Sequence, residues 1–150
     1  MGTLVSLVIA AMRVLGRDER VPPNEELAES IARAVQDEPE SDRARWAVTM
    51  AVYAWHESRL GYFWDGGALQ FDSCRSGDGG RSWGPFQEQA PKAIACASFD
   101  ASRWWLRRAH GSLKACGNLN AYVSGSCDRG GRVTRFRMRE VARIQKEIGQ

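Results

Sequence analysis

The chain has 150 residues, of which 43% are hydrophobic and 26% charged, and its formal net charge is +3. This length suits one domain with a single core, and so small a net charge excludes a partner defined by overall charge alone. We therefore expect one compact domain over residues 1–150, acting as a monomer.

The N-terminal quarter of the chain predicts two helices. Residues 3–15 form an apolar helix with Thr3 as its cap. Asn24 then caps a second helix, which stops at Pro39. The apolar residues of this second helix recur at helical spacing, at Leu27, Ile31, Ala34 and Val35.

A third helix opens at Ser41 and carries the most apolar stretch of the chain. Residues 46–55 are apolar nearly all round, which is typical of a helix at the centre of a domain. The last turn holds His56 and Glu57, and Gly61 follows as a stop signal.

The next segment changes in character. Residues 62–88 are rich in glycine and lack helical periodicity, which favours a small hairpin with turns. A short helix can start at Pro91. Further helices are expected over residues 100–111 and over residues 112–124, the latter with a break near Gly117.

The final helix is expected over residues 131–148. Five apolar side chains should form its inner face, namely Val133, Phe136, Val141, Ile144 and Ile148. The whole pattern predicts a mainly α protein, of α+β type, with a small β-hairpin region.

The cysteine count is even, at Cys74, Cys96, Cys116 and Cys127. Four cysteines allow three pairings, and the short segment between Cys116 and Cys127 favours that pair, which leaves Cys74 with Cys96. Four free thiols in a cytosolic protein are the alternative. No CxxC pair exists and both histidines are distant in sequence, so we expect neither a zinc site nor a cofactor.

Positive charge concentrates near the C-terminus. Between residues 129 and 146 a single acid, Glu140, stands among seven basic residues: Arg129, Arg132, Arg135, Arg137, Arg139, Arg143 and Lys146. Such a face can meet nucleic acid or an anionic cell envelope, or it can be the solvated side of a terminal helix. Nucleic-acid binding would leave Glu57 and the glycine-rich loop without a role, so we do not expect it.

Glu57 is the strongest candidate for chemistry. It ends a helix that should be buried, close to Tyr53 and Trp55. Apolar surroundings disfavour a carboxylate, so the side chain is expected to keep its proton and to serve as a general acid. A glutamate that simply points into water from a helix end is the alternative.

Two further segments offer groups that suit a polar substrate. The glycine-rich loop 77–87 holds Ser82 and Gln87, which can hydrogen-bond a sugar. Tyr122 has a hydroxyl that can reach an acidic site from a helix. A surface loop and a core tyrosine are the respective alternatives.

In this order the segments resemble the lysozyme-like superfamily, in particular goose-type lysozymes and soluble lytic transglycosylases. The family's Glu-Ser pair is matched by Glu57-Ser58, its Ser-x-Gly-Leu-Met-Gln-like stretch by residues 82–87, and its Ala-Tyr-Asn-x-Gly segment by residues 121–125. The resemblance covers residues 45–127. It implies a helical bundle around a central buried helix, with a small β-hairpin region.

The resemblance also implies a function, namely cleavage of the β-1,4 bond between N-acetylmuramic acid and N-acetylglucosamine in peptidoglycan. Glu57 is then the general acid, and Asp78, nine residues before Gln87, is the second carboxylate. Ser82, Gln87 and Tyr122 are the implied substrate-binding residues, and no metal is required.

Two positions depart from the family pattern. Gln89 stands where the goose-type pattern has an acid, and Val123 replaces the asparagine of the tyrosine segment. These departures keep two alternatives open, a lytic transglycosylase that releases 1,6-anhydromuramyl products and a non-catalytic wall-binding or virion protein of the same fold.

A bacteriolytic enzyme of this kind acts outside the cytoplasm, in the periplasm or the cell wall. The apolar run at the N-terminus lacks a preceding positive segment and is too short to span a membrane. We therefore expect no signal peptide and no transmembrane segment, with delivery by another route, such as a phage particle.

Overall fold

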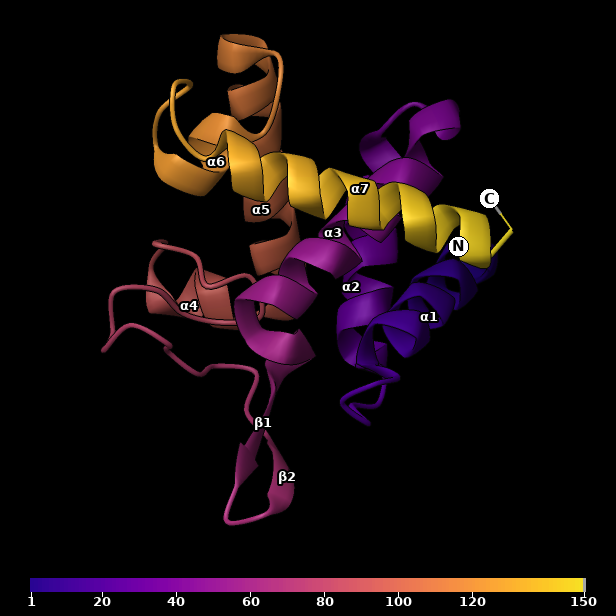
Figure 1. Ribbon diagram of the computed structural model, residues 1–150, viewed down its shortest axis with the longest axis vertical. Coiled ribbons are helices and arrows are strands. Elements are labelled where there is room, and N and C mark those ends of the chain that lie inside the picture. The colour runs from indigo at the N-terminus through magenta and orange to yellow at the C-terminus, as the bar shows by residue number, and fades with distance from the viewer. Residues whose placement is uncertain (150) are drawn as a thin grey trace.

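The computed structural model describes residues 1–149, and its longer helices pack around one central helix, α3 (Glu40–Ser58). Every residue from Ala47 to Trp55 is buried. Helices α1, α2, α5 and α7 all contact α3, and Figure 1 shows α7 crossing in front of it. The prediction of a central, buried third helix is therefore confirmed.

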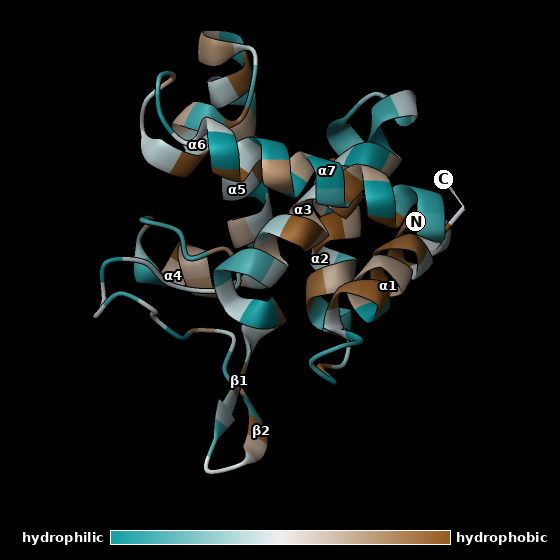
Figure 2. Ribbon diagram, viewed as in Figure 1, coloured by the Kyte–Doolittle hydropathy of each residue, from teal (hydrophilic) through white to brown (hydrophobic). Residues whose placement is uncertain are grey.

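The N-terminal helices α1 (Gly2–Gly16) and α2 (Glu25–Ala34) pack against each other. The Asn24 side chain caps α2 as predicted, since it accepts a hydrogen bond of 3.0 Å from the backbone of Leu27. A 3₁₀ turn, η1 (Val35–Asp37), then leads to α3. Figure 2 shows hydrophobic residues concentrated on α1 and on the central helix.

A two-stranded antiparallel hairpin follows the central helix. A second 3₁₀ turn, η2 (Arg59–Gly61), leads into β1 (Tyr62–Asp65), which pairs with β2 (Ala68–Phe71). The turn residues Gly66 and Gly67 both have positive φ, as the tight two-residue connection requires. The predicted class, mainly α with a small β-hairpin, is confirmed.

Helices α4 (Lys92–Cys96), α5 (Ser98–Cys116), α6 (Asn120–Ser124) and α7 (Gly131–Glu147) make up the rest of the chain. The prediction of a helix end at Gly111 is wrong, because α5 continues through it. A glycine inside a helix costs only about 1 kcal/mol, and burial of the α5 residues around it, among them Trp105 and Ser112, outweighs that cost.

Three helix starts also differ from the prediction by a few residues. Helix α1 has no side-chain cap at Thr3, α3 begins at Glu40 directly after Pro39, and α5 begins at Ser98. Proline fits the entry to a helix because its φ is already helical. None of these three helices has a side-chain hydrogen bond at its N-cap.

The inner face of α7 is rotated relative to the prediction. Val141 and Ile144 are buried as expected, but Val133 and Phe136 are exposed, Phe136 at 51%. Residues three and four apart share a helix face, and the buried set here is joined by Thr134 and Arg137. Inward placement of Arg137 is decided by its partner on α3, described below.

Both predicted disulfides are present, Cys74–Cys96 and Cys116–Cys127, and no free cysteine occurs among residues 1–149. The first ties the segment after the hairpin to α4. The second joins the end of α5 to the loop that precedes α7. Within the same range, no helix combines the length and apolar character that a membrane span requires.

Gly84 and Gly111 provide a matched test of this packing. A methyl group on Gly84 would overlap the carbonyl oxygen of Ala95, and its φ is +77°. Gly84→Ala should therefore lower the free energy of unfolding by about 3 kcal/mol. Gly111→Ala should raise it by about 0.5–1 kcal/mol, since nothing lies within 4 Å of the added carbon. Urea unfolding of both variants checks this, and equal effects would contradict it.

Candidate active site

Glu57 lies in the last turn of α3, and its side chain is 28% exposed. One carboxylate oxygen accepts a hydrogen bond of 2.7 Å from the guanidinium of Arg137. Arg137 itself is only 12% exposed and lies 4.7 Å from the centre of the Tyr53 ring. The surroundings expected to be apolar thus include a charged guanidinium, because the largely buried Arg137 reaches Glu57 from α7.

Three adjoining cavities share Glu57 in their lining. The first, of about 400 Å³, extends towards the hairpin and includes Trp64. The second, of about 160 Å³, lies towards Gly77 and Gln87. The third, of about 350 Å³, reaches Tyr122 on α6. Because they share residues, these cavities form one groove that runs from the hairpin past Glu57 to α6.

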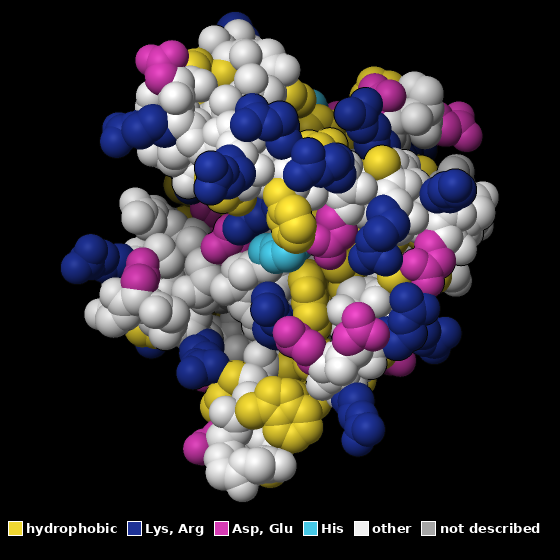
Figure 3. Space-filling model, viewed as in Figure 1, with side chains coloured by type: hydrophobic (Ala, Val, Ile, Leu, Met, Phe, Trp, Pro, Cys, Tyr) yellow, Lys and Arg dark blue, Asp and Glu magenta, His cyan; other side chains and the backbone are white. Residues whose placement is uncertain are grey.

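Figure 3 shows this face hollowed between the part that carries α6 and the part that carries α4. The same view shows basic side chains gathered along α7, where Arg132, Arg135, Arg139 and Arg143 are exposed. The basic stretch noted in the sequence is therefore mostly the outer side of α7, with Arg137 turned inward as the exception.

Ser58 joins the end of α3 to the glycine-rich loop. Its hydroxyl donates a hydrogen bond of 2.7 Å to the carbonyl of Pro85 and accepts one from the backbone of Gly61. A single side chain thus fixes both the loop and the start of the hairpin next to Glu57. The Glu-Ser pair is therefore a structural junction as well as a sequence motif.

The Gln87 side chain is fully used within its own loop. Its amide nitrogen donates to the carbonyls of Arg75 and Gly84, and its carbonyl oxygen accepts from the backbone of Gly77. Gln87 has a positive φ of 47° and lines two of the three cavities. Its amide therefore shapes the wall of the groove, and a ligand has to compete for it.

Asp78 organises the same loop. Its carboxylate accepts hydrogen bonds from Ser76, from the backbone of Arg81 and from that of Ser82. These bonds, those from Ser82 foremost, hold the pKa of Asp78 below its ordinary value. Ser82 is buried and lines the cavity near Tyr122, whereas Asp78 lines none of the three cavities.

A different aspartate shares a cavity with Glu57. Asp72 follows the second strand of the hairpin and lines the 160 Å³ cavity together with Glu57 and Gln87. One of its oxygens accepts a hydrogen bond from the backbone of Cys74. Sequence reasoning missed Asp72 because only the hairpin register brings the end of β2 back to the end of α3.

Tyr122 donates a hydrogen bond of 3.1 Å to Glu88. The second oxygen of Glu88 accepts from Arg108 at 2.9 Å, so a carboxylate only 1% exposed is held by two partners. We expected Tyr122 to approach Glu57 or a sugar. Its hydroxyl is instead engaged by Glu88, a residue that the sequence motifs did not single out.

The electrostatics of this cluster follow from burial. Burial raises the pKa of Glu88, and the guanidinium of Arg108 opposes that shift. Burial, then the charges of Glu88 and Glu57, raise the pKa of the Tyr122 phenol well above its ordinary value. Burial also raises the pKa of Tyr53 to about 12. Both tyrosines are therefore neutral at physiological pH, and Tyr122 is the one whose hydroxyl donates a hydrogen bond.

No group of His, Cys, Asp and Glu residues within 1–149 is arranged to hold a metal ion. The nearest histidine to Glu57 in sequence, His56, pairs with Glu140 at 2.9 Å and packs against the Phe136 ring. This pair anchors α7 to α3 beside the Glu57–Arg137 pair.

Comparison with known proteins finds no relative for this chain. No protein-family model matches it, and no curated protein and no solved structure matches it either. A function therefore has to be inferred from the groove itself.

The raised pKa of Glu88 predicts a specific pH dependence of stability. A carboxyl with a raised folded-state pKa binds more protons in the folded than in the unfolded state, so its contribution to stability is lost as pH rises through that window. The free energy of unfolding of the wild type, relative to Glu88→Gln, should fall as pH rises above about 4.5, the ordinary value. Urea unfolding from pH 4 to 8 measures this.

Asp78→Asn is the contrasting variant. The lowered pKa of the wild-type Asp78 carboxyl predicts a contribution to folding stability that is present above about pH 3.8, the ordinary value, and is lost as pH falls below it. Difference curves of the same sign for the two variants would contradict the assignment of their environments.

Proposed function

We propose that the chain is a peptidoglycan-degrading glycosidase of lysozyme-like fold, which cleaves the β-1,4 bond between N-acetylmuramic acid and N-acetylglucosamine with Glu57 as general acid. The observation that carries this proposal is that three segments of the chain meet at one site. Glu57, the loop ending at Gln87 and the helix of Tyr122 are distant in sequence, and all three line one open groove.

The groove has the chemistry that a polysaccharide needs. Trp64 is 56% exposed and lines its hairpin end together with Phe63, so an indole face is available for a sugar ring. Amide and hydroxyl groups of Gln87, Gln89 and Ser124 lie along the other end. Exposed aromatic faces with interspersed neutral polar groups suit hydroxylated, amide-bearing ligands.

Proton donation by Glu57 requires its pair with Arg137 to open. In the free protein the Arg137 guanidinium donates to one oxygen of the Glu57 side chain at 2.7 Å, so that oxygen is not free to meet a glycosidic oxygen. A sugar that enters the groove beside Glu57 displaces water and separates the two side chains. The carboxyl then takes up a proton, protonates the glycosidic oxygen and assists an oxocarbenium-like transition state.

The fate of the sugar cation depends on a second group. A hydrolase that inverts configuration needs a carboxylate about 6.5–9.5 Å from the acid to hold a water molecule. Asp72 is the candidate that shares a cavity with Glu57, and Asp78 is the candidate from the family resemblance. Asp78 would have to exchange hydrogen bonds of its loop for that water.

Intramolecular ring closure is the alternative fate. The muramyl 6-hydroxyl can attack the anomeric carbon, with Glu57 returning as the base that removes its proton. The engagement of Asp78 within its own loop favours this transglycosylase outcome. It gives a 1,6-anhydro product and needs no second carboxylate.

The two disulfides support a site of action outside the cytoplasm, because disulfides persist in oxidising compartments. This fits a substrate in the cell wall.

A non-catalytic wall-binding protein is the second candidate function. The observation that favours it is the Glu57–Arg137 pair itself, because a permanently paired carboxylate would leave a groove that binds glycan without cutting it. Release of soluble fragments from purified peptidoglycan separates the two functions.

Glu57→Gln is the direct test of the general acid. General acid catalysis contributes about 10²–10⁴-fold, so the variant should lose at least about 100-fold in turbidity clearing of purified walls while its Tm is retained. Glu147→Gln, which alters an exposed ion pair with Arg17, is the matched control and should clear walls normally. Full clearing by Glu57→Gln would remove the proposal.

Arg137→Gln tests the opening of the ion pair. Without the guanidinium the Glu57 side chain has no partner to leave before it meets a sugar, so clearing should be at least as fast as in the wild type. Arg135→Gln changes an exposed arginine on the outer side of α7 and should clear walls at the wild-type rate. Loss of clearing by Arg137→Gln, with an intact fold, would mean that Arg137 is needed in place.

Product analysis of Asp72→Asn and Asp78→Asn separates the two chemical outcomes. If Asp72 holds the water, wild-type products carry reducing muramic acid, and Asp72→Asn should lower turnover by about 10²-fold or more. Mass spectrometry that finds only anhydromuramyl ends in the wild type would exclude hydrolysis and support ring closure.

A further inference from the structure

A second cavity lies away from the Glu57 groove, at the other end of α3. It has a volume of about 350 Å³, is partly open, and is lined by the first half of α3, the end of α5 with the loop that follows, and α7. This volume falls within the range of small-molecule sites. Neither Glu57 nor any residue of the glycine-rich loop lines it.

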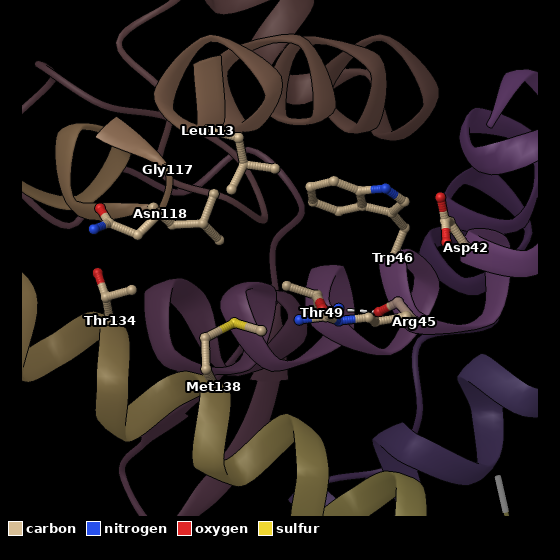
Figure 4. Close-up of a pocket in the computed structure, with 10 residues that line it drawn as sticks. Asp42, Arg45, Trp46, Thr49, Leu113, Gly117, Asn118, Thr134 and Met138 are labelled. Atoms are coloured by element: carbon tan, nitrogen blue, oxygen red, sulfur yellow. Dashed lines mark hydrogen bonds between the residues drawn. The ribbon is translucent and has the colours of Figure 1, made fainter. Parts of the chain in front are cut away.

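Figure 4 shows how the side chains are distributed along this cavity. Asn118 and Thr134 lie at one end, with Leu113 and Met138 towards the middle. The opposite end holds Arg45 and Asp42 beside the indole of Trp46. The cavity therefore has a neutral polar end, an apolar middle and an end that carries one charge of each sign.

The neutral end contains an unused polar group. Thr134 is 6% exposed, and its hydroxyl makes no hydrogen bond with another described residue. The Tyr53 hydroxyl lies near that of Thr134, but the two oxygens do not form a hydrogen bond of ordinary geometry. A buried hydroxyl without a partner is costly, so a ligand or water that supplies one is favoured at this point.

The charged end is open to solvent, since Asp42 and Arg45 are both exposed. Neither Asp42 nor Arg45 belongs to an ion pair among residues 1–149. Asp42 takes part only in a local hydrogen bond with Ser41. Arg45 can bind a carboxylate through two parallel hydrogen bonds, and Asp42 can accept from an ammonium group. A ligand that carries both charges satisfies both residues, whereas a ligand of one sign meets repulsion from one of them.

We propose that this cavity binds a short peptide that carries both a free carboxylate and a free ammonium group. The charged groups lie at Arg45 and Asp42, small aliphatic side chains contact Leu113 and Met138, and a peptide amide reaches Asn118 and Thr134. The apolar middle disfavours a fully hydroxylated sugar. The binding proposal does not depend on the proposed enzyme activity. Only the choice of a cell-wall peptide as the probe rests on that activity.

The test measures binding of the tripeptide L-Ala-γ-D-Glu-meso-diaminopimelate to the full chain by calorimetry and by chemical-shift changes. The wild type should bind it, and Arg45→Gln should raise Kd roughly tenfold, as expected for loss of a charge-assisted contact. Arg13→Gln, an exposed arginine on α1 outside the cavity, should bind like the wild type.

Thr134→Val separates ligand contact from folding. Removal of an unpartnered buried hydroxyl should keep or raise the Tm, and Kd should still increase severalfold. Glu57→Gln should bind the peptide normally, which makes this outcome independent of whether the groove is catalytic.

Four results would overturn the proposal. They are absence of peptide binding at millimolar concentration, equal binding by wild type and Arg45→Gln, loss of binding in Glu57→Gln, and displacement of the peptide from this cavity by tri-N-acetylglucosamine. The third result would place the peptide in the groove, and the fourth would make the cavity a sugar site.

Discussion

Burial of residues 47–55 of α3 on all sides is the constraint from which the rest of the structure follows. An apolar stretch of helix without a polar face has to be enclosed by other elements, and here α1, α2, α5 and α7 supply that enclosure. Most polar residues of α3 lie towards its two ends, with the buried Thr49 between them. Both cavities with unused or functional polar groups accordingly lie at the ends of α3, one around Glu57 and one around Arg45.

The C-terminal end of α3 is fixed by polar contacts with the glycine-rich loop and with α7. Ser58 fixes the glycine-rich loop, while His56 and Glu57 each pair with a residue of α7. Since α7 contributes both partners from consecutive turns, its rotation is set by these pairs. No residue of α7 lines the three cavities around Glu57, so α7 acts on the candidate site through the partners that it gives to His56 and Glu57.

Two carboxylates, Glu57 and Glu88, have different environments. Glu57 is partly exposed and has one arginine partner, whereas Glu88 is enclosed and has both Arg108 and Tyr122. Burial disfavours the charge on Glu88, and its hydrogen bonds with Arg108 and Tyr122 offset part of that cost. Glu88 is thus suited to position Tyr122 and Arg108, and only Glu57 is placed to meet a ligand.

The sequence by itself determined the helical class, the central apolar helix, the hairpin and both disulfides, because these depend on local periodicity, turn residues and short spacings. It also selected Glu57, Gln87 and Tyr122, which the tertiary structure brings to one groove. Tertiary structure alone decided that Arg137 and not Phe136 turns inward, that Asp72 shares a cavity with Glu57, and that Glu88 takes the Tyr122 hydroxyl. Each of these is a pairing between residues far apart in the chain, and its energy depends on burial and partner geometry, which no local pattern of residues records.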